Sequence, residues 1–364
     1  MIRTTAWIIT EAEHGPLEEA EYAFPEPEGD EVLAAPLFGC WEGNMGHAVK
    51  REPLNLCKAR GEPQVVLGNA GVVRILDVPQ GHSNLKAGDV CLLFCNGVAD
   101  AFGYPKLIYG YDAPKTIGVL AKTIKLRPEQ LIKLPTPLKY SLPQWAAFSL
   151  RYITAWANWR VALQCWQSQM PECLPAQAFV AGWGGGVSMA ELSLASMHGC
   201  KTLMTASGKD RMAVLRAHGI DGFDRSAVPS SEFEKAFLSD LKEKSSGLGA
   251  SIFVDNLGGA LYRITLAALA RQGVVTSSGW KCGIMTPSAR AIECISRHIH
   301  VHTHYARYQE GLDAVAFAQT SGWMPPGPER IYEWHEIPEL MAQYESGDIS
   351  SYFPVFRVNP EGVG

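Results

Sequence analysis

The chain has 364 residues, of which 47% are hydrophobic and 19% charged, and its formal net charge is −5. This length and composition suffice for two domains with a substantial core and exclude a disordered chain. Because no long basic run is present, nucleic acid is disfavoured as the main partner.

Secreted and membrane-spanning proteins are also disfavoured. The first residues, "MIRTTAWIITEAEHG", contain only a short apolar piece followed at once by acids, which is not a signal peptide. No apolar run approaches the roughly 18 residues that span a bilayer. The nine cysteines are irregularly spaced without a CxxC pair, so neither a disulfide framework nor a structural zinc loop is indicated. We therefore expect reduced thiols in a cytoplasmic protein.

Residues 1–150 contain short β-type runs separated by turn signals. The runs are "TAWIIT", "EVLAAPLFG", "QVVLGNAGVVRILDV", "GDVCLLFC" and "GVLAKTIKL". Runs of this kind predict a partly closed β-domain. Beyond about residue 305, "IYEWHEIPELMAQYESGDISSYFPVFRV" predicts a helix and then a strand, which we expect to return to this first domain.

The pattern changes near residue 145, where "SLPQWAAFSLRYITAWANWRVAL" favours a long apolar helix. The strand candidates that follow are "AQAFVAGW", "KTLMTAS", "SIFVDNL", "GVVTSSGW" and "IHVHTHY". Between them we expect helices at about 187–199, 208–218, 231–243, 259–271 and 287–297. Alternation at this spacing predicts a parallel sheet covered by helices on both faces.

A glycine-rich turn separates the first of these strands from its helix. It reads "GWGGGVS", and its candidate contact residues are Gly182, Gly184, Gly185, Gly186 and Val187. Glycines let backbone N–H groups approach a diphosphate, and the helix N-terminus adds partial positive charge. A plain tight turn is the alternative, but the four strand–helix units that follow favour dinucleotide binding.

The next strand ends without an acid. Proteins that bind NAD usually place Asp or Glu there, on the ribose 2′-hydroxyl, whereas this chain reads "LMTASGKDR". Ser207, Lys209 and Arg211 could instead hold a 2′-phosphate, although an ordinary solvated loop is the alternative. We therefore predict NADPH rather than NADH.

The β-rich first part, the "LKAGDV" turn, the glycine-rich turn and the closing "EIPELMAQYESG" helix together resemble the medium-chain dehydrogenase/reductase superfamily. This resemblance implies an α/β fold, with a GroES-like partly closed β-domain and a Rossmann-type doubly wound parallel sheet. It implies a GroES-like domain at 1–150, completed by about 306–364, and a Rossmann domain at 151–305. A homodimer formed through the edge strand near 299–305 is implied as well.

The zinc alcohol dehydrogenases of that superfamily carry a Cys, a Gly-His-Glu and a distal Cys or acid. Cys40 matches the first position, but Asn69 and Ala70 replace the ligand and its neighbour, and "FSLRYITAW" offers no distal Cys. One thiolate cannot hold zinc, which needs three protein ligands. We therefore expect no metal, and a packed free thiol at Cys40.

Other stretches resemble the crotonyl-CoA carboxylase/reductase branch of enoyl-thioester reductases. They are "LCKARGEPQVVLGNAGVV", "LIYGYDAP" and "HIHVHTHYARYQEGLDAVA". The resemblance implies a site His at His304 and an aromatic–acid pair at Tyr111 and Asp112. Glu42 falls where that branch has an Asn, and Tyr-Asp replaces Phe-Glu, so whether CO₂ is fixed stays open.

Five polar residues are the candidates for catalysis: His304, Tyr111, Asp112, Glu42 and Asn69. His304 could donate to a developing enolate or relay a proton, or the histidines of "HIHVHTHY" could fill space or, at 300, 302 and 304, bind a metal. The alternatives are a pocket wall for Tyr111, a turn cap for Asp112 and an exposed loop acid for Glu42. Further cofactor contacts are expected at Thr154, Ser277, Ser278 and Gly279.

The predicted function is an NADPH-dependent, zinc-independent reductase of an activated C=C bond. The substrate expected is an enoyl thioester on CoA or a carrier protein. A quinone or enone oxidoreductase, a zinc-free carbonyl or imine reductase, and a cofactor-binding subunit without turnover remain alternatives. No motif names the substrate.

Overall fold

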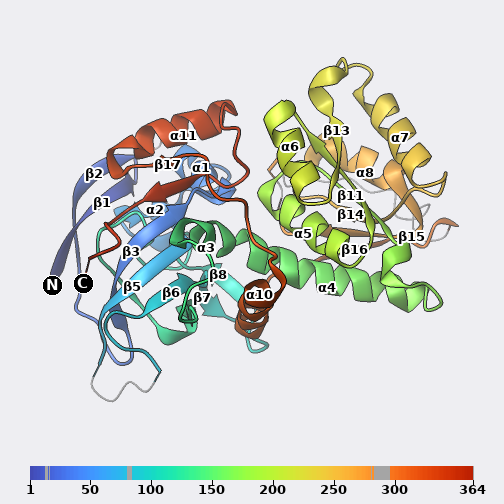
Figure 1. Ribbon diagram of the computed structural model, residues 1–364. Helices are drawn as coiled ribbons and strands as arrows, with labels where there is room; N and C mark the ends of the chain where they lie inside the picture. The colour runs from blue at the N-terminus through green and yellow to red at the C-terminus, as the bar shows by residue number, and fades with distance from the viewer. Residues whose placement is uncertain (13–14, 16, 80–83, 280, 283–295, 364) are drawn as a thin grey trace. The chain divides into compact units, whose positions relative to one another are not determined.

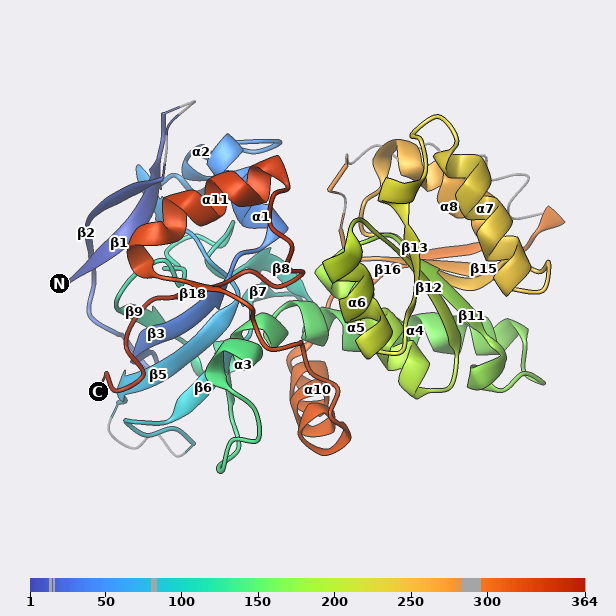
Figure 2. The same cartoon turned by 45° about the horizontal axis from the view of Figure 1, so that its top comes forward.

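The structure is a computed structural model that describes residues 1–12, 15, 17–79, 84–279, 281–282 and 296–363. The chain forms two compact units, Met1–Ile153 with Arg307–Gly364, and Thr154–Ala306 (Figure 1). We call the first the β-rich unit and the second the parallel-sheet unit. Figure 2 shows the same elements from a second direction.

The β-rich unit contains three sheets with mostly antiparallel pairing. A three-stranded sheet has the order β2-β1-β4, a seven-stranded sheet has the order β10-β6-β5-β3-β18-β17 with β9 on β3, and β7 pairs with β8. The strands are β1 (Ile2–Thr10), β2 (Glu18–Phe24), β3 (Val32–Cys40), β4 (Gln64–Val66), β5 (Gly71–Asp77), β6 (Val90–Leu93), β7 (Asn96–Ala99), β8 (Pro105–Ile108), β9 (Ile124–Leu126), β10 (Leu131–Lys133), β17 (Ile331–Tyr332) and β18 (Val355–Arg357). The helices are α1 (Gly43–Lys50), α2 (Leu56–Arg60), α3 (Leu142–Phe148), α10 (Tyr308–Ser321) and α11 (Ile337–Ser346), and α4 (Arg151–Gln169) begins here.

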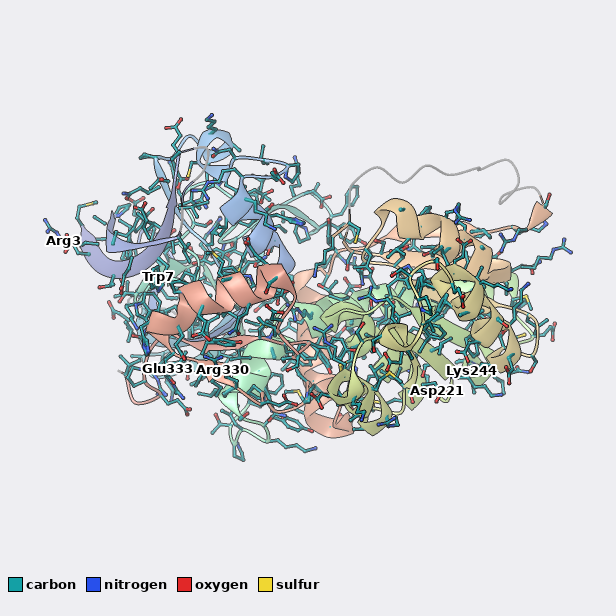
Figure 3. The ribbon with its side chains drawn as sticks, turned by 90° about the horizontal axis from the view of Figure 1, so that it is seen from above. Arg3, Trp7, Asp221, Lys244, Arg330 and Glu333 are labelled. Carbon is teal, nitrogen blue, oxygen red and sulfur yellow. The ribbon has the colours of Figure 1, made fainter. Side chains whose placement is uncertain are left out.

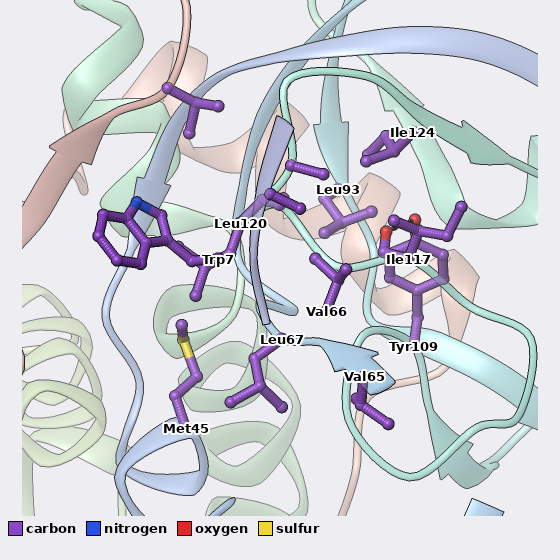
Figure 4. Packing of buried hydrophobic residues seen from close by; sticks show 14 of the residues in the cluster. Trp7, Met45, Val65, Val66, Leu67, Leu93, Tyr109, Ile117, Leu120 and Ile124 are labelled. Carbon is purple, nitrogen blue, oxygen red and sulfur yellow. Dashed lines mark hydrogen bonds between the residues drawn. The ribbon is translucent and has the colours of Figure 1, made fainter. Parts of the chain in front are cut away.

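The core of this unit joins segments that are far apart in the sequence. Figure 4 shows Trp7 of β1 near Leu67 and Leu120, within a larger cluster of buried side chains. The end of the chain contributes as well, because β18 pairs antiparallel with β3, with Val355 opposite Cys40. Residues after 306 therefore complete the sheet that residues before 150 begin.

Three glycines allow two loops of the β-rich unit to touch backbone to backbone. The Gly68 N–H donates to the Gly110 carbonyl at 2.9 Å, and the Val119 N–H donates to the Gly68 carbonyl at 3.0 Å. Gly110 has a φ of +63°, and a Cβ there would lie 2.9 Å from the Gly118 Cα and closer still to the Gly68 oxygen. The contact therefore requires glycine at this position. We call Gly68, Gly110 and Gly118 the glycine clasp.

The parallel-sheet unit is a six-stranded parallel sheet with the order β13-β12-β11-β14-β15-β16. Its strands are β11 (Phe179–Gly182), β12 (Lys201–Ala206), β13 (Asp221–Asp224), β14 (Ala250–Val254), β15 (Leu269–Ser277) and β16 (His300–Thr303). Its helices, besides most of α4, are α5 (Gly186–Met197), α6 (Lys209–Ala217), α7 (Phe233–Lys244) and α8 (Tyr262–Ala268).

Helices cover both faces of the parallel sheet, as the sequence predicts. Ala181 and Phe253 belong to a buried cluster with Phe237 of α7, on one face. On the other face, Leu192 of α5 lies over Gly182. The predicted α/β class, a GroES-like β-unit with a Rossmann-type sheet, is confirmed.

Some elements differ from the prediction. The helix expected at 259–271 ends at Ala268, because residues 269–271 already belong to β15. The edge strand β13 was not predicted, since "DGFD" has no apolar run; its Asp221 lies 3.8 Å from Lys244 of α7 (Figure 3). Most of the helix expected at 287–297 lies outside the described residues. Among the described helices, none has the length and apolarity to cross a bilayer.

We expect Gly110→Ala to lower the free energy of unfolding by about 2 kcal/mol or more, because the new Cβ would push the two loops of the glycine clasp apart and sit at a strained φ. Urea denaturation would measure this loss.

Gly29→Ala is the matched control, since Gly29 has the same φ of +63° but no atom within 4 Å of an added Cβ. This variant should lose only about 1 kcal/mol. Equal losses for the two variants would show that close packing at Gly110 is unimportant.

Candidate functional site

The glycine-rich turn leaves β11 and enters α5 within a few residues. A Cβ at Gly184 would lie 2.7 Å from the Thr205 carbonyl oxygen, so the turn approaches β12 too closely for a side chain. The Gly184 N–H donates to the Thr205 hydroxyl at 3.0 Å. Gly186, Val187 and Ser188 form the first turn of α5, so no carbonyl of the helix accepts a hydrogen bond from their N–H groups. These three donors, rather than that of Gly184, are available to an anion.

The turn also lies at the point where the strand order reverses. β11 has β12 on one side and β14 on the other, so successive connections leave it in opposite directions. In open parallel sheets, ligands bind beyond the carboxyl ends of the strands at such a switch point. The half-exposed residues 184–187 therefore occupy the expected position of a diphosphate site.

The residues expected to hold a 2′-phosphate follow β12. Ser207 and Arg211 are half-buried and Lys209 is exposed, with Lys209 beginning α6. Asp224, which the sequence analysis did not single out, ends the neighbouring β13, opposite Ala206. The Asp224 carboxylate accepts hydrogen bonds from the N–H and the hydroxyl of Ser226 at 2.9 and 2.6 Å. These two bonds are the main reason why the pKa of Asp224 is lowered, and the Gly208 backbone contributes in the same direction.

The other expected cofactor contacts are also in the parallel-sheet unit. Ser277 ends β15, Ser278 and Gly279 follow it, and Thr154 lies in the first turns of α4. The Ser277 hydroxyl donates to the Gly279 carbonyl at 3.0 Å, which closes this loop. His304 follows β16 and is half-buried. Apart from Thr154, all these residues lie at the carboxyl edge of the sheet.

The histidines of β16 differ in their surroundings. His300 is exposed, whereas His302 pairs in register with Thr276, and neither of its ring nitrogens has a hydrogen-bond partner. Burial, and then the neighbouring His304 and His300, lower the pKa of His302 to about 4. Within the part of the chain that the structure describes, no three His, Cys, Asp or Glu side chains are arranged to bind a metal.

In the β-rich unit, Glu42 is buried rather than in an exposed loop. Its Oε2 accepts from Arg151 Nε at 2.8 Å, and its Oε1 is buried without a nitrogen or oxygen donor. Arg151 also donates to the carbonyls of Trp41, at 2.7 Å, and Tyr352. The exposed-acid alternative is therefore wrong for Glu42. Its carboxylate instead belongs to a buried ion pair.

Cys40 is buried beside this pair. Burial raises the pKa of the Cys40 thiol far above its ordinary value, with Glu42 adding to the rise and Arg151 opposing it. Burial likewise raises the pKa of Glu42, while Arg151 opposes the shift. The thiol is therefore protonated at neutral pH.

Asn69 and Tyr111 each adjoin a glycine of the glycine clasp, so they belong to the two loops whose backbones touch there. Asn69 is only 2% exposed, and its side-chain oxygen has no hydrogen-bond partner. The backbone of Cys40 donates to the Ala70 carbonyl at 3.1 Å, which ties β3 to the same loop. Burial raises the pKa of Tyr111, with Asp112 as the smaller cause, so its phenol is protonated at neutral pH.

The Asp112 carboxylate caps a turn, which is the alternative left open for it. It accepts from the backbone N–H of Ile108 at 2.5 Å. Four of the five candidate residues thus lie in three joined segments of the β-rich unit, and His304 is in the parallel-sheet unit. Arg151 was missed because an arginine within an apolar helix gave no sign of a partner 109 residues away.

The β-rich unit is interrupted in sequence by the parallel-sheet unit, whose glycine-rich turn lies at the switch point of a Rossmann-type sheet. No protein-family model and no curated protein sequence matches the chain. Solved structures do, and they show that the chain has the fold of the medium-chain dehydrogenase/reductase superfamily.

Three of these structures illustrate the range of similar proteins. The 2-octenoyl-CoA carboxylase reductase CinF, in complex with NADP and 2-octenoyl-CoA, has a TM-score of 0.82 at 18% identity and covers 100% of this chain and 89% of its own. The crotonyl-CoA carboxylase/reductase AntE with NADP has a TM-score of 0.80 at 17% identity, and the match covers 98% of this chain and 94% of AntE. An Aeropyrum pernix alcohol dehydrogenase has a TM-score of 0.78 at 19% identity, and the match covers 97% of this chain and 99% of the dehydrogenase.

Glu191 of α5 is a buried acid near the glycine-rich turn. It is 0% exposed, and neither of its carboxyl oxygens has a hydrogen-bond partner. Burial therefore raises its pKa well above the ordinary value, so the folded protein retains this proton to a higher pH than the unfolded chain does.

We expect the stability of the wild type, relative to Glu191→Gln, to fall as pH rises above the ordinary Glu pKa. Because the folded protein holds the Glu191 proton more tightly than the unfolded chain does, this proton adds to the free energy of unfolding at low pH. That contribution falls by on the order of 1 kcal/mol per pH unit between the unfolded-state pKa and the folded-state pKa. Urea denaturation of both proteins between about pH 5 and 8 measures the difference in their free energies of unfolding. Glu243→Gln on the exposed face of α7 is the control and should show no such trend; a flat difference for Glu191→Gln would contradict the assignment.

Proposed function

We propose that the protein is an NADPH-dependent, zinc-independent reductase of a C=C bond conjugated to a thioester carbonyl. The observation that carries this proposal is the set of three helix N–H donors at the switch point, next to β12, which ends at Ala206 without an acid at that position and is followed by Lys209 and Arg211 in the first turn of α6. The similar enoyl-CoA carboxylase/reductases with bound NADP add support for the cofactor and the substrate class.

The choice of NADPH depends on the residues after β12. Ala206 stands where an acid would bind the ribose 2′-hydroxyl, and Ser207, Lys209 and Arg211 follow. Asp224, the carboxylate that ends the next strand, already accepts hydrogen bonds from the N–H and the hydroxyl of Ser226. This arrangement favours a 2′-phosphate over a free 2′-hydroxyl.

Zinc independence is supported by the surroundings of Cys40. Zinc needs three protein ligands, whereas Cys40 is buried beside the Arg151 guanidinium, whose positive charge would repel a zinc ion. Asn69 and Ala70 supply neither an imidazole nor a carboxylate. The residues at this position therefore do not fit a zinc ion, and Arg151 already supplies the positive charge there.

The chain's own residues must orient the substrate and supply a proton. Bound NADPH supplies a hydride to the β-carbon, and one proton at the α-carbon completes the reduction to the saturated thioester. Asn69 and the protonated Tyr111 hydroxyl would stabilise negative charge on the thioester oxygen through hydrogen bonds. His304 would deliver the proton. Asp112 would act through the turn that presents Tyr111.

The test is incubation of the metal-free protein with NADPH and crotonyl-CoA. The proposal expects loss of NADPH absorbance, a saturated product and no dependence on added zinc. Mass analysis of the product with and without bicarbonate separates reduction from carboxylation. Turnover only of free enones, quinones or carbonyl compounds would favour the other reductases, and tight NADPH binding without any turnover would favour a silent subunit.

We expect Lys209→Ala to weaken NADPH binding by about tenfold while changing NADH binding little, because only NADPH carries the 2′-phosphate. Fluorescence titration with both nucleotides measures the two dissociation constants.

Lys201→Ala is the matched control, because Lys201 is an exposed lysine at the other end of the same strand. It should leave both dissociation constants unchanged. If Lys209→Ala weakened both nucleotides equally, the 2′-phosphate assignment would be wrong.

A further inference from the structure

Two consecutive residues after β14, Asp255 and Asn256, make side-chain hydrogen bonds that join several segments of the parallel-sheet unit. Asp255 is 2% exposed, and its Oδ1 accepts from the N–H groups of Leu257 and Gly258 at 3.0 and 2.8 Å. Its Oδ2 accepts from the Thr265 hydroxyl of α8 at 2.6 Å. The carboxylate is thus fixed by its own loop and fixes Thr265 in turn.

Thr265 passes this restraint to the glycine-rich turn. Its hydroxyl oxygen accepts from the indole N–H of Trp183 at 2.8 Å while the hydroxyl donates to Asp255. The Trp183 ring is buried against Phe237 and Phe253, with ring centroids 4.8 and 5.0 Å away. Because Trp183 stands between Gly182 and Gly184, its side chain anchors the backbone of the turn.

Asn256 joins two other segments. Its Nδ2 donates to the Ser188 hydroxyl in the first turn of α5 at 3.3 Å. Its Oδ1 accepts from the N–H and the hydroxyl of Ser278 at 2.8 and 3.1 Å. One side chain therefore ties the helix end that would bind the diphosphate to the loop after β15.

We propose that Asp255 and Asn256 are positioning residues that hold the diphosphate turn and the 277–279 loop in the geometry that binds the cofactor; the inference rests on the proposed function. A run of three glycines is flexible, so ordering it during binding would weaken affinity. The chain from Trp183 through Thr265 to Asp255 orders the turn beforehand, which preserves affinity. Neither Asp255 nor Asn256 needs to touch the nucleotide.

The decisive variant is Thr265→Val, which keeps the side-chain shape and removes the hydroxyl that joins Trp183 to Asp255. We expect the NADPH dissociation constant to rise about tenfold. Thr265→Ser restores the hydroxyl and should bind NADPH within about twofold of the wild type. Asn256→Leu, which breaks the other arm, should weaken NADPH similarly.

Two readouts separate positioning from a general loss of stability. In the nucleotide-free protein, hydrogen exchange at the amides of residues 183–188 should speed up about tenfold in Thr265→Val. Affinity for adenosine 2′-monophosphate, which lacks the diphosphate, should stay within about twofold of the wild-type value.

Thr202→Val is the matched control. Thr202 is also buried, and its hydroxyl makes one hydrogen bond, to the Gly219 carbonyl at 3.3 Å, near the amino end of β12. It should lose stability without changing NADPH affinity or exchange at 183–188. If Thr265→Val matched Thr202→Val in both readouts, the positioning proposal would be overturned. Failure of the wild type to bind NADPH would instead overturn the proposed function, which the exchange measurement does not require.

Discussion

The parallel-sheet unit depends on the close approach of the turn after β11 to the end of β12. There the Thr205 carbonyl leaves no room for a side chain at Gly184, and the Thr205 hydroxyl oxygen accepts a hydrogen bond from the Gly184 N–H. This contact places the N–H groups of Gly186, Val187 and Ser188 in the first turn of α5. Glycines make the approach sterically allowed, but they do not make it rigid. The rigidity comes from Trp183, whose indole is both packed and hydrogen-bonded.

The β-rich unit uses the opposite strategy around its candidate residues. Instead of free donors, it buries an ion pair between Glu42 and Arg151 and places a protonated thiol next to it. A buried pair of this kind does not by itself favour folding, because removing both charges from water costs about as much as their attraction returns. Its effect is local: the bonds of Arg151 to Glu42 and to the Trp41 carbonyl fix the chain just after β3.

Sequence patterns predicted the strands that are buried on both faces. β11, β12, β14 and β15 each contain a buried stretch rich in apolar residues, and hydrophobic burial dictates such strands locally. The edge strands were harder to predict. β2 has three glutamates among seven residues, and β13 is four residues of which two are aspartates, so neither shows an apolar run.

The candidate site was predictable where one segment supplies the chemistry, as in the glycine-rich turn and the residues after β12. It was not predictable where partners are far apart in the chain. Nothing local to Glu42 signals Arg151, and nothing local to Trp183 signals Thr265, which lies 82 residues later. Such bonds depend on how strands and helices assemble, which a pattern in one segment does not encode.

The pairing of β18 with β3 has a consequence for the order of events at the ribosome. Residues 154–306 are made as one continuous segment, before residues 307–364, and contain every strand of their own sheet. The flank of β3 that β18 covers stays bare until residues 355–357 have been made. During synthesis the parallel-sheet unit can therefore fold before the chain is finished. The β-rich unit keeps unpaired backbone N–H and C=O groups on β3 until β18 is made. In that interval the nascent chain offers a docking edge to any extended polypeptide nearby.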